Sequence, residues 1–324
     1  MRLCGTPSPP SLFPVLLLHE TLFTSQMAQD PFLLSANGKT LALPPHHDVP
    51  ARIMGILNVT PDSFYAASRV QSVSDALTRA KAFVSSGCTI IDVGGESTRP
   101  KGKAYGEGAT PVDEAAERER VVPVIEAIRA ELPEVWISID TYKPGVAAAA
   151  LEAGADIVND VTAGRLFPAM FDVVADYDVP LVLMHSHGKP GDMPHTLLGA
   201  ADLATVEKEL MQQVDTALAH GCRQLILDPG FGFGKDVSGN LALIGATAQW
   251  QRFGWPLLTG VSRKSTIGAV LGETISADGA DDRLAGSLAL TALAIRGGSA
   301  IVRTHDGRPT AATAHMLHAM ARYL

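Results

Sequence analysis

Short hydrophobic runs recur along the chain from residue 52 onward, each followed by a polar or glycine-rich loop and then by a longer amphipathic segment. This repetition is typical of βα units, in which helices join parallel strands. The predicted strands occupy residues 53–58, 89–93, 136–140, 157–159, 181–185, 224–228, 257–260 and 301–303. The predicted helices occupy residues 72–86, 113–130, 144–153, 167–176, 201–220, 238–251, 281–296 and 310–322.

The number and length of these repeats match a (β/α)8 barrel, or TIM barrel, in which eight parallel strands are each followed by a helix. We therefore expect an α/β protein with a single barrel domain at residues 51–324. A doubly wound open sheet is the alternative. The first predicted strand is not followed by the glycine pattern of dinucleotide binding that would support it.

Residues 1–50 differ in character, and we expect them to form an N-terminal extension. Residues 1–26 hold a proline cluster and an apolar run that Pro14 interrupts, so they are expected to be largely disordered, with Met27 as an alternative start. A secretion signal needs a longer unbroken apolar region and a small-residue cleavage site. No stretch approaches the roughly 20 apolar residues of a membrane span. We therefore expect a cytoplasmic protein without a membrane partner.

Charge and cysteine content narrow the class of protein further. The formal net charge is -8, which leaves no basic field to attract the phosphates of a nucleic acid. The three cysteines, Cys4, Cys88 and Cys222, are widely scattered, so they suggest neither a disulfide framework nor a zinc site. These features favour a reducing compartment and small-molecule substrates.

Polar residues that could do chemistry lie at the ends of the predicted strands. In a (β/α)8 barrel the C-terminal strand ends meet on one rim, where active sites are built. A single Asp or Asn there commonly caps the next helix, but so many coincident strand ends favour a functional rim. The residues concerned are Asn58, Asp92, Asp140, Asn159, His185, Asp228, Ser262, Arg263, Lys264, Arg303 and His305.

Asp228 is the most informative of these strand ends. It closes a buried apolar run, where a carboxylate is costly unless protein groups or a ligand supply hydrogen-bond donors. The GFGFGK run that follows is not a Walker A phosphate loop, because Pro229 replaces the first Gly and Asp236 follows the Lys. We interpret it as a shaped ligand wall in which Phe233 can stack, while Phe231 could equally belong to the core.

Two groups of basic residues invite different interpretations. His185 and His187 could face one metal, as in zinc-dependent barrel hydrolases, but the next strand end has no further His, so a structural role is favoured for at least one. The cations at the last two strand ends need anionic or carbonyl partners. With Asn58 they suggest a site for a phosphorylated group accompanied by Mg²⁺. These donors are Arg263, Lys264, Arg303 and His305, and the acceptors on the middle strands are Asp140, Asn159 and Asp228.

The motifs along this rim, in their order and spacing, resemble those of the dihydropteroate synthase family over residues 52–322. The matching segments are IMGILNVTPDSF (53–64), IDVGGESTRP (91–100), ISIDTYKP (137–144), IVNDVTAG (157–164), LMH (183–185), LDPGFGFGK (227–235), SRKS (262–265) and RTHD (303–306). The resemblance implies a pterin-binding transferase of folate biosynthesis and a target of sulfonamides. Such an enzyme joins 6-hydroxymethyl-7,8-dihydropterin pyrophosphate to p-aminobenzoate with Mg²⁺, usually as a homodimer. The implied reaction is dissociative and needs no strong general base, because an aromatic amine is already nucleophilic.

The resemblance also implies roles for individual residues. The pterin ring would contact Asp140, Asn159, Met184, Asp228, Phe233, Lys264 and Arg303. The pyrophosphate would contact Asn58, Arg303 and His305, with Asn58 also the Mg²⁺ ligand. The p-aminobenzoate side would comprise Asp62, Ser63, Phe64, Thr98, Arg99, Pro100, Ser262 and Arg263. The residues expected to act in catalysis are Asp140, Asp228, Lys264, Arg303 and His305.

The chain departs from the family pattern at four places: Lys101 stands for Gly, Ser186-His187 for Met with Gln or Arg, Thr266 for a larger apolar residue, and Gly307 for Val. None of these positions is an implied pterin or pyrophosphate ligand. Three alternatives remain beside an active synthase. They are a non-catalytic pterin-binding paralogue, a pterin-binding domain of a corrinoid methyltransferase, and a metal-dependent barrel hydrolase.

Overall fold

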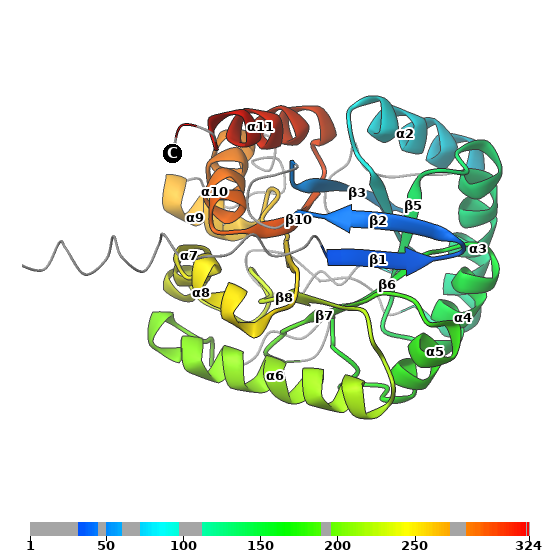
Figure 1. The fold of residues 1–324 in the computed structure, drawn as a ribbon, viewed down its shortest axis with the longest axis horizontal. Helices are drawn as coiled ribbons and strands as arrows, with labels where there is room; N and C mark the ends of the chain where they lie inside the picture. Colours follow the sequence, from blue (N-terminus) through cyan, green and yellow to red (C-terminus); the bar gives the residue numbers. More distant parts are fainter. Residues whose placement is uncertain are drawn as a thin grey trace, which may run out of the picture.

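The protein is a closed barrel of eight parallel strands surrounded by helices, as the computed structural model shows (Figure 1). The structure describes residues 32–44, 50–59, 72–96, 112–188, 196–272, 283–321 and 323. Around the barrel the strands follow the order of the chain, and the last pairs with the first. They are β3 (Arg52–Asn58), β4 (Ile90–Gly94), β5 (Trp136–Asp140), β6 (Ile157–Asp160), β7 (Leu181–Met184), β8 (Leu225–Asp228), β9 (Leu257–Thr259) and β10 (Ser299–Thr304).

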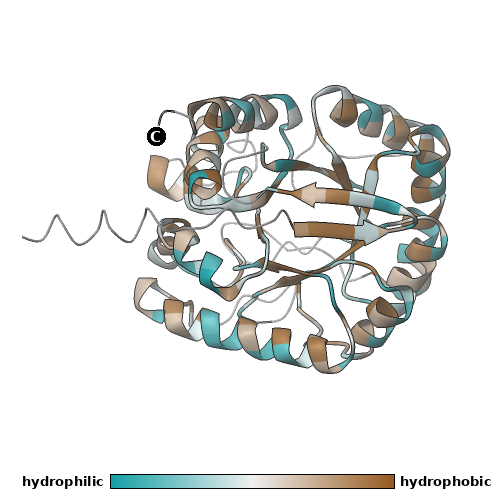
Figure 2. Cartoon of the chain, viewed as in Figure 1, coloured by the Kyte–Doolittle hydropathy of each residue, from teal (hydrophilic) through white to brown (hydrophobic). Residues whose placement is uncertain are grey.

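The helices form the outer layer, because each carries one apolar stripe that it buries against the strands. Along α6, for example, Val206, Leu210 and Val214 are buried at helical spacing. Hydrophobic and hydrophilic residues accordingly alternate along it in Figure 2. The helices are α2 (Val73–Ser85), α3 (Glu114–Glu131), α4 (Pro144–Glu152), α5 (Ala169–Tyr177), α6 (Leu203–Ala219), α7 (Val237–Gly245), α8 (Thr247–Trp250), α9 (Ser265–Leu271), α10 (Leu284–Arg296) and α11 (Gly307–Met320).

The predicted (β/α)8 barrel is therefore confirmed, with differences in detail. The single helix expected at residues 238–251 is divided, because α7 ends at Gly245, a residue of low helix propensity, and α8 begins at Thr247. The short helix α9 was not expected. It starts directly after the SRK motif and ends at Gly272, whose φ of 72° is the left-handed conformation that favours glycine.

The sequence analysis also missed a two-stranded hairpin before the barrel, formed by β1 (Phe32–Ala36) and β2 (Lys39–Leu43). Asn37 and Gly38 form its turn with φ angles of 52° and 72°. Positive φ at both positions is the requirement of a type I′ turn, which Asn-Gly fits best. The predicted N-terminal extension thus contains regular structure at residues 32–43, whereas residues 1–31 lie outside the described part.

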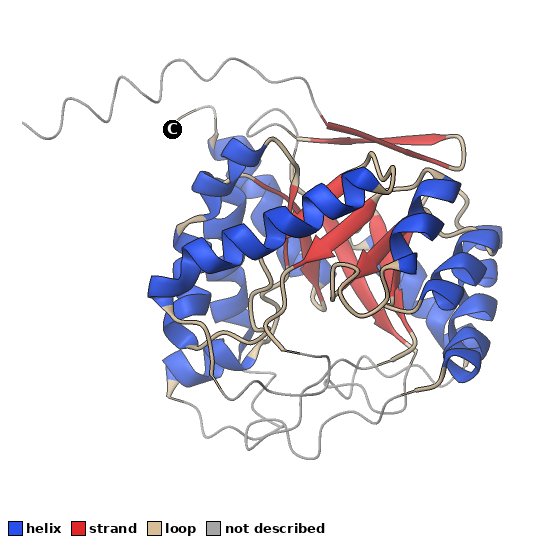
Figure 3. Ribbon diagram, turned by 90° about the horizontal axis from the view of Figure 1, so that it is seen from below, coloured by secondary structure: helices blue, strands red, loops and turns tan. Residues whose placement is uncertain are grey.

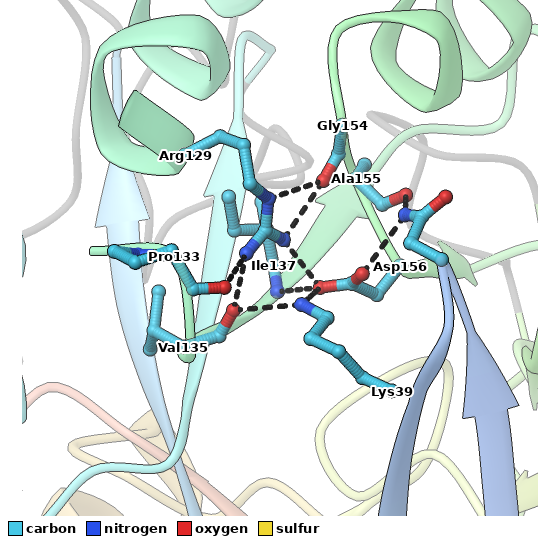
Figure 4. Close-up of polar contacts among 9 residues, drawn as sticks. Lys39, Arg129, Pro133, Val135, Ile137, Gly154, Ala155 and Asp156 are labelled. Atoms are coloured by element: carbon cyan, nitrogen blue, oxygen red, sulfur yellow. Dashed lines mark hydrogen bonds and ion pairs between the residues drawn. The ribbon is translucent and has the colours of Figure 1, made fainter. Parts of the chain in front are cut away.

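The hairpin lies across one end of the barrel (Figure 3), and polar contacts identify it as the N-terminal end. Asp156, just before β6, accepts hydrogen bonds from Asn37 at 2.9 Å and from Lys39 at 2.7 Å. It also accepts from Arg129 at 2.6 Å and from the Ile137 N–H at 2.9 Å (Figure 4). The opposite, C-terminal end is the one that carries the candidate site. In the described ranges no helix is long and apolar enough to cross a membrane.

Candidate functional site

Arg303 lies at the centre of the C-terminal rim, held between two carboxylates. Its Nε donates to Asp92 at 2.6 Å and its Nη2 donates to Asp140 at 2.6 Å. Asn159 donates its amide to Asp92 at 3.3 Å. The parallel register produces this grouping, because Asp140 lies beside Asn159 on the neighbouring strand. Asp92 was predicted only as a polar strand end without a role, and in the structure it is the fully buried partner of Arg303.

Asn58 lies at the end of β3, on the same rim. The register of β3, β4 and β5 aligns Asn58 with Gly94 and Gly94 with Asp140. A Cβ added to Gly94 would lie 3.5 Å from both the Asn58 Oδ1 and the Asp140 Cβ, so these two side chains flank the glycine. The predicted pyrophosphate residue and the predicted pterin residue are thus close neighbours.

Asp228 ends β8 as expected and is 6% exposed. One carboxylate oxygen accepts the Gly230 N–H at 2.8 Å. Burial raises the pKa of Asp228, and the Lys264 ammonium opposes that rise. Burial likewise raises the pKa of Asp140, against the effect of Arg303. Both carboxylates thus lose water on folding, and a ligand with N–H donors would restore hydrogen bonds to them.

Lys264, which follows β9, lies close enough to Asp228 to interact with its charge. Its ammonium donates to the Phe231 carbonyl and lies 4.6 Å from the centroid of the Phe233 ring. Burial lowers its pKa to about 8, with Asp228 opposing the change. Phe231 is 3% exposed and packs in the core with Ile244 and Val261, which resolves the choice that its sequence left open. Phe233 is only half-buried, as the predicted stacking role requires.

The glycine-rich loop of residues 230–235 is shaped from within by its own lysine. Lys235 is buried, and its ammonium donates to the carbonyls of Gly230 at 2.9 Å and Phe233 at 3.0 Å. It also donates to the His185 Nδ1 at 2.9 Å. A Cβ on Gly230 would lie 1.7 Å from the His185 carbonyl oxygen, so only glycine fits there. The Lys235 ammonium thus binds the carbonyls of its own loop, as expected of a loop that is not a Walker A phosphate loop.

The histidine pair does not form a metal centre among the residues described. Because the His185 Nδ1 accepts from Lys235, its Nε2 is the nitrogen that donates to Glu209 at 2.9 Å. Burial, reinforced by Lys235, lowers the pKa of His185 to about 2, so the ring is neutral. No group of three potential metal-binding His, Cys, Asp or Glu side chains occurs in the described ranges. The structural role favoured for at least one of the pair fits His185.

His305 and Ser262 interlock at the ends of β10 and β9. The His305 N–H donates to the Ser262 Oγ at 3.1 Å, and this hydroxyl lies 3.0 Å from the His305 Nδ1. The Ser262 hydroxyl thus contacts both the backbone and the ring of His305. Burial lowers the pKa of His305 to about 3, with Arg303 as the next cause. The His305 imidazole is therefore neutral and lies near the Arg303 guanidinium, which is suited to bind an anionic group.

Arg263 is tied into the structure more firmly than its predicted role suggests. It adopts a left-handed φ of 56°, and its guanidinium pairs with both oxygens of Asp306 at 2.8 and 2.7 Å. Its side chain is 7% exposed. Its assignment to the p-aminobenzoate side stays a prediction. The other predicted residues of that side, apart from Ser262, lie outside the described ranges, as does Lys101. They are Asp62, Ser63, Phe64, Thr98, Arg99 and Pro100.

A buried ionic cluster behind the rim was missed by the sequence analysis. Lys143 donates to both Glu96 and Glu117, and the Tyr142 hydroxyl donates to Glu96 at 2.9 Å. Burial raises the pKa of Glu117 and Lys143 opposes that rise. The only signal in the sequence was a lysine three residues after the strand-end Asp140, which alone indicates no partner. The cluster holds Glu96, the last described residue of the loop that follows β4.

Comparison with known proteins agrees with this geometry. Residues 54–305 match the family described as pterin binding enzyme. The dihydropteroate synthase of Escherichia coli K12 is 41% identical over 279 residues, which cover 86% of this chain and 92% of that protein. The Bacillus subtilis enzyme is 42% identical over 270 residues, covering 83% and 88%.

Solved structures give the same answer. The Yersinia pestis dihydropteroate synthase with a sulfonamide drug complex superposes with a TM-score of 0.80 at 34% identity, covering 90% of this chain and 100% of that one. The Xanthomonas albilineans enzyme with 4-aminobenzoic acid has a TM-score of 0.78 at 37% identity, covering 90% and 99%. The expected resemblance is confirmed, and the chain belongs to the pterin-binding enzyme family, among the dihydropteroate synthases.

Proposed function

We propose that this chain condenses 6-hydroxymethyl-7,8-dihydropterin pyrophosphate with p-aminobenzoate to give 7,8-dihydropteroate and pyrophosphate, a step of folate biosynthesis. One observation carries the proposal most directly. The rim holds the half-buried carboxylate of Asp140 and the buried carboxylate of Asp228, which face the cations Arg303 and Lys264. A ligand with a donor-rich heteroaromatic head and an anionic tail satisfies both sets of groups.

The pterin head fits the acceptor half of the rim. The carboxylate of Asp228 can accept the paired N–H donors of an aminopyrimidinone edge, which offsets the cost of its burial. Asp140 and Asn159 offer further polar contacts beside it. Lys264 can donate to the ring carbonyl, and Phe233, over which its ammonium already lies, can stack on the ring.

The leaving group fits the donor half. As the bond between the pterin methylene and the pyrophosphate oxygen breaks, the electron pair departs with pyrophosphate, and Arg303 and His305 stabilise the added negative charge. The carboxylates of Asp140 and Asp228 favour the cationic pterin methylene left behind. The p-aminobenzoate nitrogen then forms the new C–N bond and loses its proton to solvent.

Magnesium would fit this site as a companion of the substrate. Mg²⁺ is commonly bound by one or two side chains plus substrate phosphates and water. Asn58 offers one amide oxygen next to Asp140, and the described residues hold no cluster of three carboxylate, His or Cys groups. Bound in this way, Mg²⁺ would neutralise charge on the leaving pyrophosphate. Asn58 would be the protein ligand that orients that group.

We further propose that the chain acts as a homodimer in the cytoplasm. Exposed apolar side chains gather on α9, α10 and α11, which neighbour one another in Figure 1, and a second copy could cover them. Cys88 and Cys222 are buried free thiols, in keeping with a reducing compartment. The exposed apolar residues are Val270, Leu271, Leu293, Met316 and Met320.

The reaction is tested by following pyrophosphate release with the purified protein. Release should require dihydropterin pyrophosphate, p-aminobenzoate and Mg²⁺ together, and Asp228→Asn or Lys264→Ala should abolish it while circular dichroism shows an intact fold. Tight pterin binding without turnover would instead indicate a non-catalytic paralogue and overturn the proposal. Sulfonamides should inhibit by competing with p-aminobenzoate, and sedimentation should give twice the chain mass.

A further inference from the structure

The Gly230–Lys235 loop is held from a second side by a single amide on α7. Asn240 is 2% exposed and faces the loop backbone. Its Oδ1 accepts the Gly232 N–H at 2.6 Å, and its Nδ2 donates to the Lys235 carbonyl at 3.1 Å. The Asn240 side chain thus binds the middle and the end of the loop at once. The Asn240 amide bonds to the Gly232 N–H and the Lys235 carbonyl, whereas the Lys235 ammonium bonds to other atoms, so the two sets of contacts are separate.

Thr266 gives that amide a third hydrogen-bond partner. The Asn240 Nδ2 donates its second hydrogen to the Thr266 Oγ1 at 2.9 Å, and Thr266 is 5% exposed. An amide turned by 180° would present its oxygen to the Lys235 carbonyl and its NH₂ to the Gly232 N–H, which are both mismatched. The threonine is one of the four departures from the family pattern. Its hydroxyl here has a partner that an apolar residue could not satisfy.

This link bears on the pocket because Thr266 follows Lys264 by two residues. A Cβ on Gly232 would lie 2.7 Å from the Lys264 Cδ, so the loop backbone rests against the lysine stem. The ammonium at the end of that stem bonds the Phe231 carbonyl and lies over the Phe233 ring. The bond from Thr266 through Asn240 to Gly232 therefore joins the start of α9 to the loop and fixes the distance between Lys264 and Phe233.

We infer that Asn240, held in place by Thr266, is a positioning residue for pterin recognition, which sets the Phe233 ring and the Lys264 ammonium in the geometry that receives the pterin. The inference rests on the proposed function, and it concerns residues that touch no substrate. Loosening the link should weaken pterin binding selectively, because six of the eight residues assigned to the p-aminobenzoate side lie in the loops after β3 and β4. A merely structural role would lower stability and change both substrates alike.

The test compares three variants of the full chain. Thr266→Val removes the acceptor and nearly preserves volume, Thr266→Ser restores the hydroxyl, and Thr247→Val is the matched control. The Thr247 hydroxyl is also buried, but it donates to the Ile244 carbonyl at the C-terminal end of α7 at 2.8 Å. Calorimetry with dihydropterin pyrophosphate and Mg²⁺, without p-aminobenzoate, gives the pterin Kd directly. Steady-state kinetics gives KM for each substrate, and thermal unfolding gives Tm.

Thr266→Val should raise the pterin Kd about 5- to 10-fold, the effect of one hydrogen bond, and change the p-aminobenzoate KM less than about twofold. Thr266→Ser should return the Kd to that of the unmodified chain, and Thr247→Val should lower Tm without affecting Kd. An unchanged pterin Kd in Thr266→Val, or equal shifts for both substrates, would overturn the inference. If Thr266→Val does not fold, Thr266→Ala serves in its place. Failure of the proposed function shows separately, as absent pyrophosphate release by the unmodified chain.

Discussion

The Nε of Arg303 donates to Asp92 across the C-terminal mouth of the barrel at 2.6 Å, and Asp92 is completely buried beneath it. The carboxylate has no access to solvent, so this guanidinium balances its charge, and the Asn159 amide donates a further hydrogen bond to it. Burial opposes the charge on Arg303, and Asp92 is the largest cause that raises its pKa. Asp92 thereby keeps a cation in place where the leaving pyrophosphate is proposed to lie.

Asp92→Asn should therefore damage catalysis more than folding. The neutral amide preserves shape but loses a charge-assisted hydrogen bond, so we expect kcat/KM for the pterin substrate to fall about 10- to 100-fold. Steady-state pyrophosphate release checks this value. Asp215→Asn, an exposed change on α6, is the control and should leave kcat/KM unaltered. Retention of full activity by Asp92→Asn would show that Arg303 keeps its position without this carboxylate.

The pH dependence of the reaction should report Lys264. Burial lowers its pKa to about 8 in the free protein, and the ammonium form is the one that donates to a ring carbonyl. As pH rises through about 8 the ammonium loses its proton, so kcat/KM for the pterin substrate should fall on the alkaline side. On the acid side it should fall as Asp140 and Asp228, whose pKa values are raised by burial, become protonated.

Lys264→Arg tests which group causes the alkaline fall. A guanidinium stays charged throughout the range, so the alkaline limb should move upward by more than one pH unit while overall activity drops. The profile of kcat/KM between pH 5 and 10 distinguishes the outcomes. An alkaline limb unmoved by Lys264→Arg would assign it to another group, such as Lys235, whose pKa is also lowered by burial, to about 7.

The barrel and most of the rim could be predicted because they follow from local patterns. A parallel strand buried on both faces appears in the sequence as a continuous apolar run, and the polar residue at its end is easy to recognise. Parallel register then brings those ends together without further information. Asp140, Asn159, Asp228 and Arg303 were all placed correctly on the C-terminal rim by this reasoning.

What escaped prediction depends on contacts between distant segments. Whether Phe231 or Phe233 faces the pocket is decided by packing against α7 and α10, which no local pattern contains. Lys143 is recognisable as part of a buried cluster only when Glu96 and Glu117 are known to surround it. The Asn-Gly hairpin is different. Its turn signal was present in the sequence, but the reading of residues 1–50 as an extension obscured it.

Asp156 should be a centre of stability at the end of the barrel away from the site. It is fully buried and accepts from Lys39, Arg129 and the Ile137 N–H. Asp156→Ala leaves two cations without their shared acceptor, so we expect a loss of about 3–5 kcal/mol in the free energy of unfolding. Urea denaturation measures it. Substrate KM values should stay unchanged at temperatures where the variant is folded.

A surface ion pair provides the comparison for Asp156. Lys81 and Glu131 lie 2.8 Å apart with side chains 49% and 54% exposed. Glu131→Gln should lower the free energy of unfolding far less than Asp156→Ala does, because water screens such a pair. Equal losses of unfolding free energy in Asp156→Ala and Glu131→Gln would mean that the contacts of Asp156 with the hairpin do not stabilise the fold.

The glycine at position 307 is explained by its neighbours, and this yields a double-mutant test. A Cβ there would lie 2.9 Å from the Cys88 Sγ and 3.2 Å from the Phe83 Cδ1, so the larger residue usual in the family has no room. Gly307→Val alone should overpack the site and cost about 1–3 kcal/mol in the free energy of unfolding. Cys88→Ala alone should also destabilise, because it opens a small cavity. In the double mutant the loss in the free energy of unfolding should be smaller than the sum of the two single losses, because the space left by the Cys88 Sγ accommodates the valine. Urea denaturation measures all three losses. Strictly additive losses would mean that Cys88 does not exclude a side chain at residue 307.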